Sequence, residues 1–299
     1  MTVFMYIFCL LAWGLNFIVV KIQGTPVSLE VSLTYRLMGS AIIFICIACI
    51  MRPKIKFMPK DLVFMMIFGV CNFALSYLLF YYATIWSSAA IVTLIFSIKT
   101  VLTPIALKVF LKTKLQTRIL YGGGCGVLGV IVLVYPILAD STNSLALNGI
   151  LLACLGTVLT SIGDVSSARN NHKSINPLHS NTVGFIVAAV LLFLISVSQG
   201  HQFSFPTSYS YITSLLYLTV IASVFAWMFY LKLIEQIGPS KSSYMVALFP
   251  AIGGIASVIM GDSEPTLNLL FGCALCSFGA ALALLPKRIK SGSIPNLWR

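Results

Sequence analysis

Long apolar segments separated by short polar connections constrain the fold of this chain more than any other feature of its sequence. Each segment is about 20 residues long, the length that an α-helix needs to cross the hydrocarbon core of a bilayer. The backbone has no water partner there, so the segments must be helices, because the strands of a closed barrel would show short alternating patterns. The sequence predicts an all-α polytopic membrane protein with ten transmembrane helices, at about residues 3–21, 31–51, 62–82, 88–107, 119–137, 149–168, 181–199, 211–231, 242–260 and 269–286.

Composition supports a membrane protein and excludes a soluble one. Of the 299 residues, 59% are hydrophobic and 9% are charged, whereas roughly a quarter of the residues of a soluble domain are charged. The net charge of +12 could indicate a nucleic-acid partner, but the basic residues are dispersed and form no basic face. We therefore expect a lipid bilayer, and no nucleic acid, among the partners. The apolar segment Thr2–Leu11 carries no basic n-region, so we expect no removable signal peptide.

The basic residues alternate between connections in the way that the positive-inside rule predicts. Sixteen of the 19 basic residues lie in every second connection and in the C-terminal tail: Arg52, Lys54, Lys56, Lys60, Lys108, Lys112, Lys114, Arg118, Arg169, Lys173, Lys232, Lys241, Lys287, Arg288, Lys290 and Arg299. The other connections carry Glu30, Asp140, Asp262 and Glu264. We therefore expect a multi-pass protein of the cytoplasmic (inner) membrane with both termini in the cytoplasm.

A polar stretch near the middle of the chain divides the ten predicted spans into two sets of five. An odd number of spans in each half makes the halves antiparallel, which is the inverted-repeat arrangement of many secondary transporters. Weak internal similarity supports the division when Trp13 is aligned with Ser161. The expected parts are a first five-helix repeat over residues 1–137, an extracytoplasmic linker over 138–148, and a second five-helix repeat over 149–290.

Several short motifs occur in the order and spacing of one known family. They are Trp13-Gly-Leu-Asn-Phe with Lys21, Tyr35-Arg36-Leu, Ser87-Ser-Ala-Ala, Gly238-Pro239 before Leu248-Phe-Pro250, and Glu264-Pro265-Thr266. Over essentially its full length, the chain resembles the EamA-like family of the drug/metabolite transporter (DMT) superfamily. It departs from that family at Thr100, where a proline is common, and at Lys112-Thr113, where a Gly-Glu pair is common.

The resemblance implies a secondary transporter that moves a small organic metabolite by alternating access. An amino acid or a related carboxylate is the expected substrate, with export favoured over uptake, and a proton is a candidate coupling ion. The same resemblance leaves open a multidrug or toxic-compound exporter of the same fold. An intramembrane enzyme and a non-transporting membrane scaffold are alternatives from other classes, and the sequence leaves the oligomeric state open.

Lys99 is the most informative candidate residue, because it lies near the middle of the fourth span. An uncompensated cation at that depth costs about 2.5–3.5 kcal/mol. One interpretation places Lys99 in a hydrated cavity, where it binds an anionic group of the substrate. The alternatives are a structural ion pair with Asp164, snorkelling of the side chain, and a misplaced span.

Two further charged residues are candidates for coupling or gating. Asp164 lies in the cytoplasmic third of the sixth span, where Arg169 could hold it or where it could line the cavity as a proton carrier. Arg36 enters the second span from the outer side, near Glu30 and Lys21, and could act as an outer gate or an interfacial anchor.

The remaining candidates are polar or aromatic residues and two prolines. Trp13 and Asn16 share one face of the first span, and the asparagine predicts that this face looks inward. Tyr82, Trp227 and Tyr230 could stack on a substrate or anchor span ends at the membrane interface. Pro104 and Pro250 lie within spans and are candidate hinges.

Motifs for enzymes, metals and cofactors are missing from the sequence. The three histidines, His172, His179 and His201, lie in connections and far apart in the chain, and no P-loop, G-x-S-x-G or H-E-x-x-H pattern is present. Only Lys99 and Asp164 could form a catalytic pair within the membrane. We therefore expect no enzyme, no cofactor and no bound metal.

Overall fold

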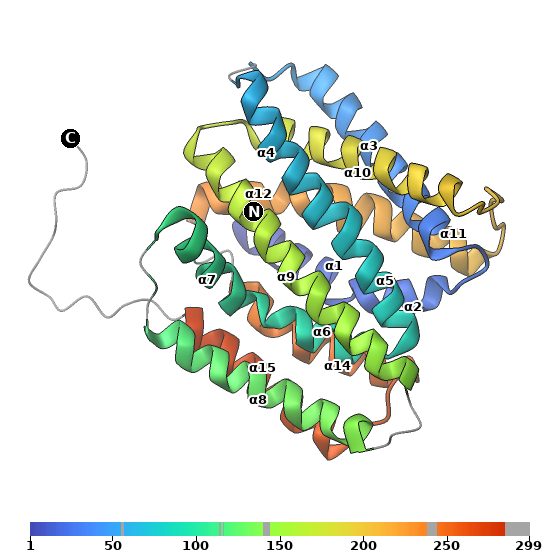
Figure 1. Ribbon diagram of the computed structural model, residues 1–299, viewed down its shortest axis with the longest axis vertical. Helices are drawn as coiled ribbons and strands as arrows, with labels where there is room; N and C mark the ends of the chain where they lie inside the picture. The colour runs from blue at the N-terminus through green and yellow to red at the C-terminus, as the bar shows by residue number, and fades with distance from the viewer. Residues whose placement is uncertain (55–56, 114, 116, 140–143, 238–243, 285–299) are drawn as a thin grey trace, which may run out of the picture.

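The computed structural model describes residues 1–54, 57–113, 115, 117–139, 144–237 and 244–284, which form a bundle of helices (Figure 1). Along the first half of the chain these are α1 (Thr2–Gly14), α2 (Asn16–Gln23), α3 (Leu29–Met51), α4 (Pro59–Gly69), η1 (Val70–Leu75), α5 (Ser76–Trp86), α6 (Ala89–Ser97), α7 (Lys99–Leu111) and α8 (Thr117–Ala139). The second half contains α9 (Ser144–His172), α10 (Pro177–Ser198), α11 (Tyr209–Leu216), η2 (Tyr217–Phe225), α12 (Ala226–Ile237), η3 (Tyr244–Leu248), α14 (Phe249–Ile259) and α15 (Leu267–Leu284). Part of the predicted linker and the basic C-terminal tail lie outside the described residues.

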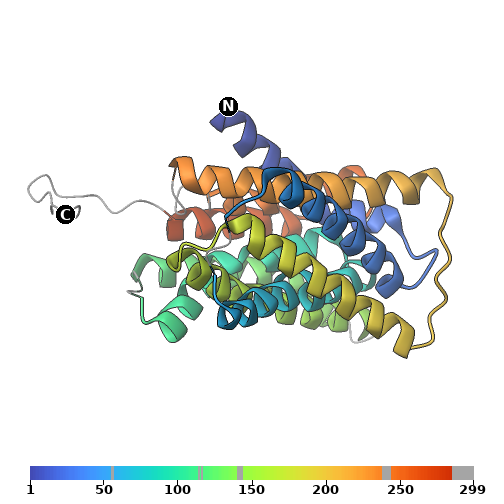
Figure 2. The same cartoon turned by 90° about the horizontal axis from the view of Figure 1, so that it is seen from above.

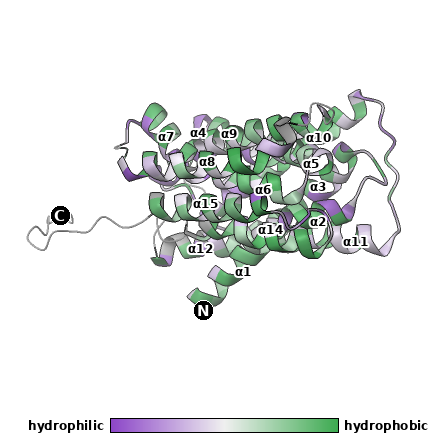
Figure 3. Cartoon of the chain, turned by 90° about the horizontal axis from the view of Figure 1, so that it is seen from below, coloured by the Kyte–Doolittle hydropathy of each residue, from purple (hydrophilic) through white to green (hydrophobic). Residues whose placement is uncertain are grey.

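The helices have the length and hydropathy of membrane spans. Within the described part of the chain, seven helical stretches are long and apolar enough to cross a bilayer, and the bent pair α1–α2 makes an eighth. α14 and α15 are also apolar but shorter, and they correspond to the ninth and tenth predicted spans. In Figure 3, hydrophobic residues cover most of the helices. The chain is therefore an all-helical, multi-pass integral membrane protein, and ten crossings remain a prediction.

The two ends of the bundle are well separated. Figure 2 shows the connection between α10 and α11 at one end and the start of the α7–α8 connection at the other. By the charge pattern described above, the α10–α11 end is the predicted outer end, and the α7–α8 end is the predicted cytoplasmic end.

Several spans are interrupted within the bundle. α1 and α2 meet at Leu15 with a bend of 42°, and η1 and η2 are π-helical turns within longer spans. A serine hydroxyl donates to a backbone carbonyl of each π-helical turn, Ser76 Oγ to Asn72 O at 2.9 Å and Ser223 Oγ to Leu218 O at 2.8 Å. A π-helical turn leaves some backbone carbonyls without their usual helical hydrogen bond. Within the hydrocarbon region no water can replace that bond, so a side chain must donate it.

The two predicted hinge prolines occupy different positions in their helices. Pro104 lies inside α7, after the short break at Ile98 that separates α7 from α6. Pro250 lies in the first turn of α14, directly after the 3-10 helix η3. A proline in a first turn removes no intrahelical hydrogen bond, so Pro250 begins a helix and does not kink one. A hinge role for either proline remains a prediction.

Glycines allow the helices to approach closely. α8 and α15 lie side by side along one edge of the bundle (Figure 1), and a Cβ atom added to Gly279 would overlap Gly122 O. On α9, Cβ atoms at Gly156 and Gly163 would meet Phe80 and Asn72 of the neighbouring α5–η1 span. These contacts explain the small residues as packing surfaces between membrane helices.

Candidate functional site

Three ion pairs of a lysine or arginine with an aspartate join segments that are far apart in the chain, and they are the main polar feature of the bundle. Their N···O distances are 3.2 Å for Lys21–Asp262, 3.0 Å for Lys99–Asp164 and 2.7 Å for Arg169–Asp61. Each pair joins one residue of the first half of the chain to one residue of the second half. These three ion pairs therefore add charged contacts to the packing of helices from the two halves against each other.

The pair of Lys99 and Asp164 lies where α7 begins and packs against α9. Thr103 Oγ1 donates a second hydrogen bond to Asp164 at 2.9 Å, and the Lys99 ammonium lies 5.4 Å from the centroid of the Phe96 ring. The two side chains are 17% and 23% exposed, so the pair is not sealed from its surroundings. Of the interpretations of Lys99 left open by the sequence, the structure shows an ion pair with Asp164, which neutralises it in this conformation.

Arg169 does not hold Asp164. Its guanidinium pairs with Asp61 at the start of α4 and lies 3.9 Å from the centroid of the Phe64 ring. The Asp61 carboxylate also accepts a hydrogen bond from the backbone N–H of Met58 at 2.9 Å, which caps α4. This pair lies at the predicted cytoplasmic end of the bundle.

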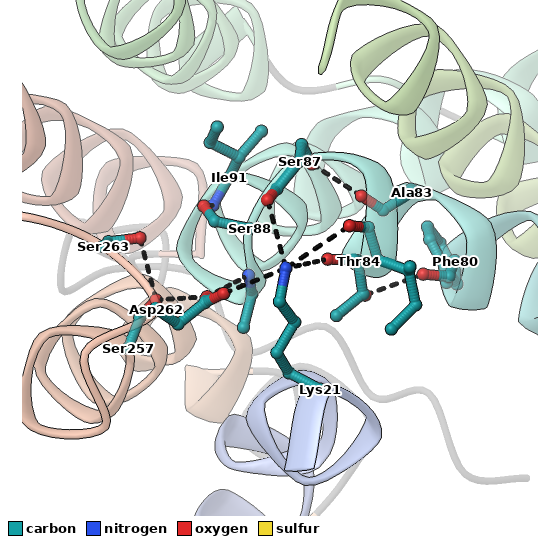
Figure 4. A network of polar contacts seen from close by, with 12 residues as sticks. Lys21, Phe80, Ala83, Thr84, Ser87, Ser88, Ile91, Ser257, Asp262 and Ser263 are labelled. Carbon is teal, nitrogen blue, oxygen red and sulfur yellow. Dashed lines mark hydrogen bonds and ion pairs between the residues drawn. The ribbon is translucent and has the colours of Figure 1, made fainter. Parts of the chain in front are cut away.

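The pair of Lys21 and Asp262 belongs to a network at the predicted outer end (Figure 4). Lys21 Nζ donates to the backbone carbonyls of Thr84, Ile85 and Ser87 at 3.2–3.4 Å. The Asp262 carboxylate accepts from the backbone N–H of Ala89 at 2.7 Å, at the N-terminus of α6, and from a nearby serine hydroxyl. The network thus connects the end of α2, the turn between α5 and α6, and the connection after α14.

Arg36 differs from the other interior cations in its partners. It lies on α3 and is 1% exposed. Its guanidinium donates to Ser223 Oγ at 3.1 Å, to the Tyr81 hydroxyl at 3.4 Å and to Asn16 Oδ1 at 3.1 Å. The guanidinium carbon lies 4.6 Å from the centroid of the Tyr77 ring. Among the described carboxylates, none forms an ion pair with Arg36.

Glu30, which the sequence places near Arg36, has other partners. Its carboxylate accepts a hydrogen bond from the Tyr82 hydroxyl at 2.5 Å and lies 3.4 Å from His201 Nε2. The Tyr82 ring packs on Trp86 at a centroid distance of 5.0 Å. Tyr82 therefore lies at the predicted outer end of the bundle, away from the cluster formed by the other aromatic candidates.

Three of the aromatic and polar candidates form one cluster. The Trp13 ring contacts Trp227 and Tyr230 at centroid distances of 5.4 Å and 5.2 Å. Trp13 Nε1 donates to the backbone carbonyl of Ala222 at 2.9 Å, and Trp227 packs on Phe73 of η1. The structure thus brings Trp13, Trp227 and Tyr230 together across α1 and α12. Of the other substrate candidates, Asn16 lies beside Arg36, Lys99 beside Asp164, and Tyr82 beside Glu30. The six candidates therefore lie at four separate places in the bundle.

Asp61, Asp262 and Ser223 were not identified as site residues from the sequence. The two carboxylates lie near span ends, where an acidic residue resembles an ordinary connection residue, and Ser223 is one of many hydroxyls in apolar segments. One signal was present, because each cation within a span requires a partner. Within the described residues, no group of three or more His, Cys, Asp or Glu side chains could hold a metal ion.

Comparison with known proteins places the fold in one family. The model of the EamA-like transporter family matches residues 1–135 and 147–285. A crystal structure among 19 matching chains has a TM-score of 0.65 at 18% sequence identity, and the match covers 94% of this chain and 96% of that one. No curated protein matches the sequence. Since the family model matches twice and covers most of the chain, this protein belongs to the EamA-like transporter family of membrane transporters.

Proposed function

We propose that this protein is a secondary transporter that moves a small organic metabolite with a carboxylate across the cytoplasmic membrane by alternating access. An amino acid or a related acid is the proposed substrate, and export is favoured over uptake. The observation that carries the proposal is the set of three ion pairs between the two halves of the chain. Two of these pairs lie at opposite ends of the bundle, as two alternating gates would require.

The outer gate in this mechanism is the Lys21–Asp262 network, and the cytoplasmic gate is the Arg169–Asp61 pair. Opening one end separates its pair and admits water, which hydrates the charges as their mutual attraction is lost. Because the desolvation penalty of an ion pair offsets much of its Coulomb attraction, such a pair can close a gate without making opening prohibitively slow.

We also propose that the halves are inverted five-helix repeats over residues 1–137 and 149–290, joined by the linker 138–148. The two π-helical turns support this, because η1 begins at residue 70 and η2 at residue 217, an offset of 147. The sequence alignment of Trp13 with Ser161 has an offset of 148. The breaks at Ile98 and at η3, which begins at residue 244, differ by a similar 146.

Lys99 and Asp164 are the proposed coupling pair. When Asp164 takes up a proton, Lys99 loses its counterion and can bind the substrate carboxylate instead. The pair's partial exposure supports this role, since a proton and a substrate must reach it. Trp13, Asn16, Tyr82, Trp227 and Tyr230 stay candidate substrate contacts, with the cluster of Trp13, Trp227 and Tyr230 suited to an apolar side chain.

A proteoliposome uptake screen tests the proposed function. Purified protein is reconstituted and offered labelled amino acids, organic acids, nucleotides and cationic drugs, with and without a pH gradient. We expect saturable uptake of a carboxylate and little uptake of cations, because a Lys99 without its counterion would attract the first and repel the second. Uptake restricted to cationic drugs would instead favour the multidrug exporter of the same fold.

A further inference from the structure

Arg36 is an interior cation whose charge no described carboxylate balances. Lys21, Lys99 and Arg169 each have a carboxylate oxygen within 2.7–3.2 Å. Arg36 is 1% exposed, and all three of its side-chain acceptors, Ser223, Tyr81 and Asn16, are neutral. A guanidinium has five N–H groups, so these three hydrogen bonds leave part of its donor capacity free. A buried charge is costly unless it is paired.

Arg36 also contacts residues at which spanning helices are interrupted. Asn16 is the first residue of α2, directly after the bend at Leu15, and Ser223 lies in the π-helical turn η2. Membrane transporters commonly build substrate sites where spanning helices are broken, and π-helical turns are frequent at functional sites. Two such interruptions, one in each half of the chain, therefore meet at the same guanidinium.

The geometry holds the guanidinium in one orientation. The centroid of the Tyr77 ring lies 4.6 Å from the guanidinium carbon. The three acceptors of the guanidinium's hydrogen bonds lie on α2, α5 and η2. A planar, preoriented guanidinium suits the two oxygens of a carboxylate, which it binds through two parallel hydrogen bonds.

We propose that Arg36 is the anion subsite for the substrate carboxylate when the outer end of the bundle is open. This deepens the proposed function, because it rests on transport and names a second cation besides Lys99 that receives the substrate's charge. Arg36 lies near the predicted outer start of α3, and opening of the Lys21–Asp262 network would part α2 and the α5–α6 turn from the connection after α14. The carboxylate then binds the guanidinium between Asn16 of the first half and Ser223 of the second half.

Benzoate and benzamide test the subsite, because they share a ring and differ in charge. Both are titrated against the full-length protein in lipid nanodiscs, with tryptophan fluorescence as the readout. We expect wild type to bind benzoate at least tenfold more tightly than benzamide, Arg36→Lys to keep part of this preference, and Arg36→Gln to lose it. Arg52→Gln removes an exposed arginine from the far end of the same helix and should behave as wild type. Equal affinities in wild type, or a preference kept by Arg36→Gln, would overturn the proposal.

Chemical modification tests the unmutated protein, in case Arg36→Gln does not fold. Phenylglyoxal reacts with accessible guanidinium groups, and mass spectrometry of the peptide that contains Arg36 measures the rate. We expect benzoate to slow modification of Arg36 at least fivefold, benzamide to leave it unchanged, and Arg52 to react at the same rate in both. Failure of Arg36 to react at all, or equal slowing by both compounds, contradicts the subsite.

The two proposals fail in different ways. Absence of transport in the screen, together with Arg36-dependent benzoate binding, would remove the proposed function and leave an anion site. Transport of a carboxylate that is unaffected by Arg36→Lys and Arg36→Gln would keep the transporter and remove the subsite.

Discussion

At the scale of single residues, Lys99 and Asp164 form an ion pair, so removing either charge leaves the other without its partner. Lys99→Gln deletes the cation and keeps a polar side chain, so we expect transport of the carboxylate identified in the screen to fall about tenfold or more. Membrane insertion should survive or improve, because an interior cation is costly to insert. Lys99→Arg should keep part of the activity, since the charge remains while its shape changes. Initial rates in proteoliposomes measure this.

The stability of the same variants separates pairing from substrate binding. Lys99→Gln leaves Asp164 without its cation, so it should lower the free energy of unfolding by about 1–3 kcal/mol, less than the cost in a fully buried pair. The double variant Lys99→Gln/Asp164→Asn should recover much of that loss but not transport. If Lys99→Gln transports at the wild-type rate and affinity, the substrate role of Lys99 is wrong and the pair is structural.

At the scale of elements, close backbone contact between α8 and α15 predicts a sharp difference between two glycines. Gly279→Ala places a methyl group against the backbone carbonyl of Gly122, which cannot move aside as a side chain would. Overpacking of this kind costs about 1–3 kcal/mol. Gly124→Ala is the matched control, since its Cβ would meet nothing within 4 Å, and alanine favours a helix by about 1 kcal/mol over glycine. Thermal unfolding in detergent should show a lower Tm for Gly279→Ala and an unchanged or higher Tm for Gly124→Ala.

The ion pair between Lys21 of α2 and Asp262, in the segment after α14, predicts which end of the bundle opens when one charge is removed. Lys21→Met keeps side-chain length but deletes the ion pair with Asp262 and the hydrogen bonds to the α5–α6 turn. We expect spin labels at Ile22 and Glu264 to show longer distances in this variant by double electron–electron resonance. Labels at Lys54 and Lys173, at the opposite end, provide the control and should not separate. An unchanged distance between Ile22 and Glu264 would exclude the network as the outer gate.

At the scale of the whole molecule, the charge pattern predicts orientation in the membrane. A cysteine at Ser144 should react with an impermeant thiol reagent in intact cells, whereas a cysteine at Lys54 should react only after the cells are opened. Both positions are exposed, so protection reports the side of the membrane and not burial. The native cysteines are replaced beforehand. Labelling of the Lys54 position together with protection of the Ser144 position would reverse the orientation.

Membrane insertion is the part of this protein that its sequence determined by itself. The energy of placing a residue in a bilayer depends on that residue and its near neighbours, so apolar segments and their basic flanks can be read along the chain. The helical class and the family resemblance followed from those segments and motifs, and the family match bears out the resemblance. The partner of each interior charge was decided only by the tertiary structure. Lys99 pairs with Asp164 and Lys21 with Asp262, while Arg36 contacts Ser223 and no described carboxylate. These contacts join segments far apart in the chain, and they depend on how each helix is rotated and where it is broken, which hydropathy does not encode.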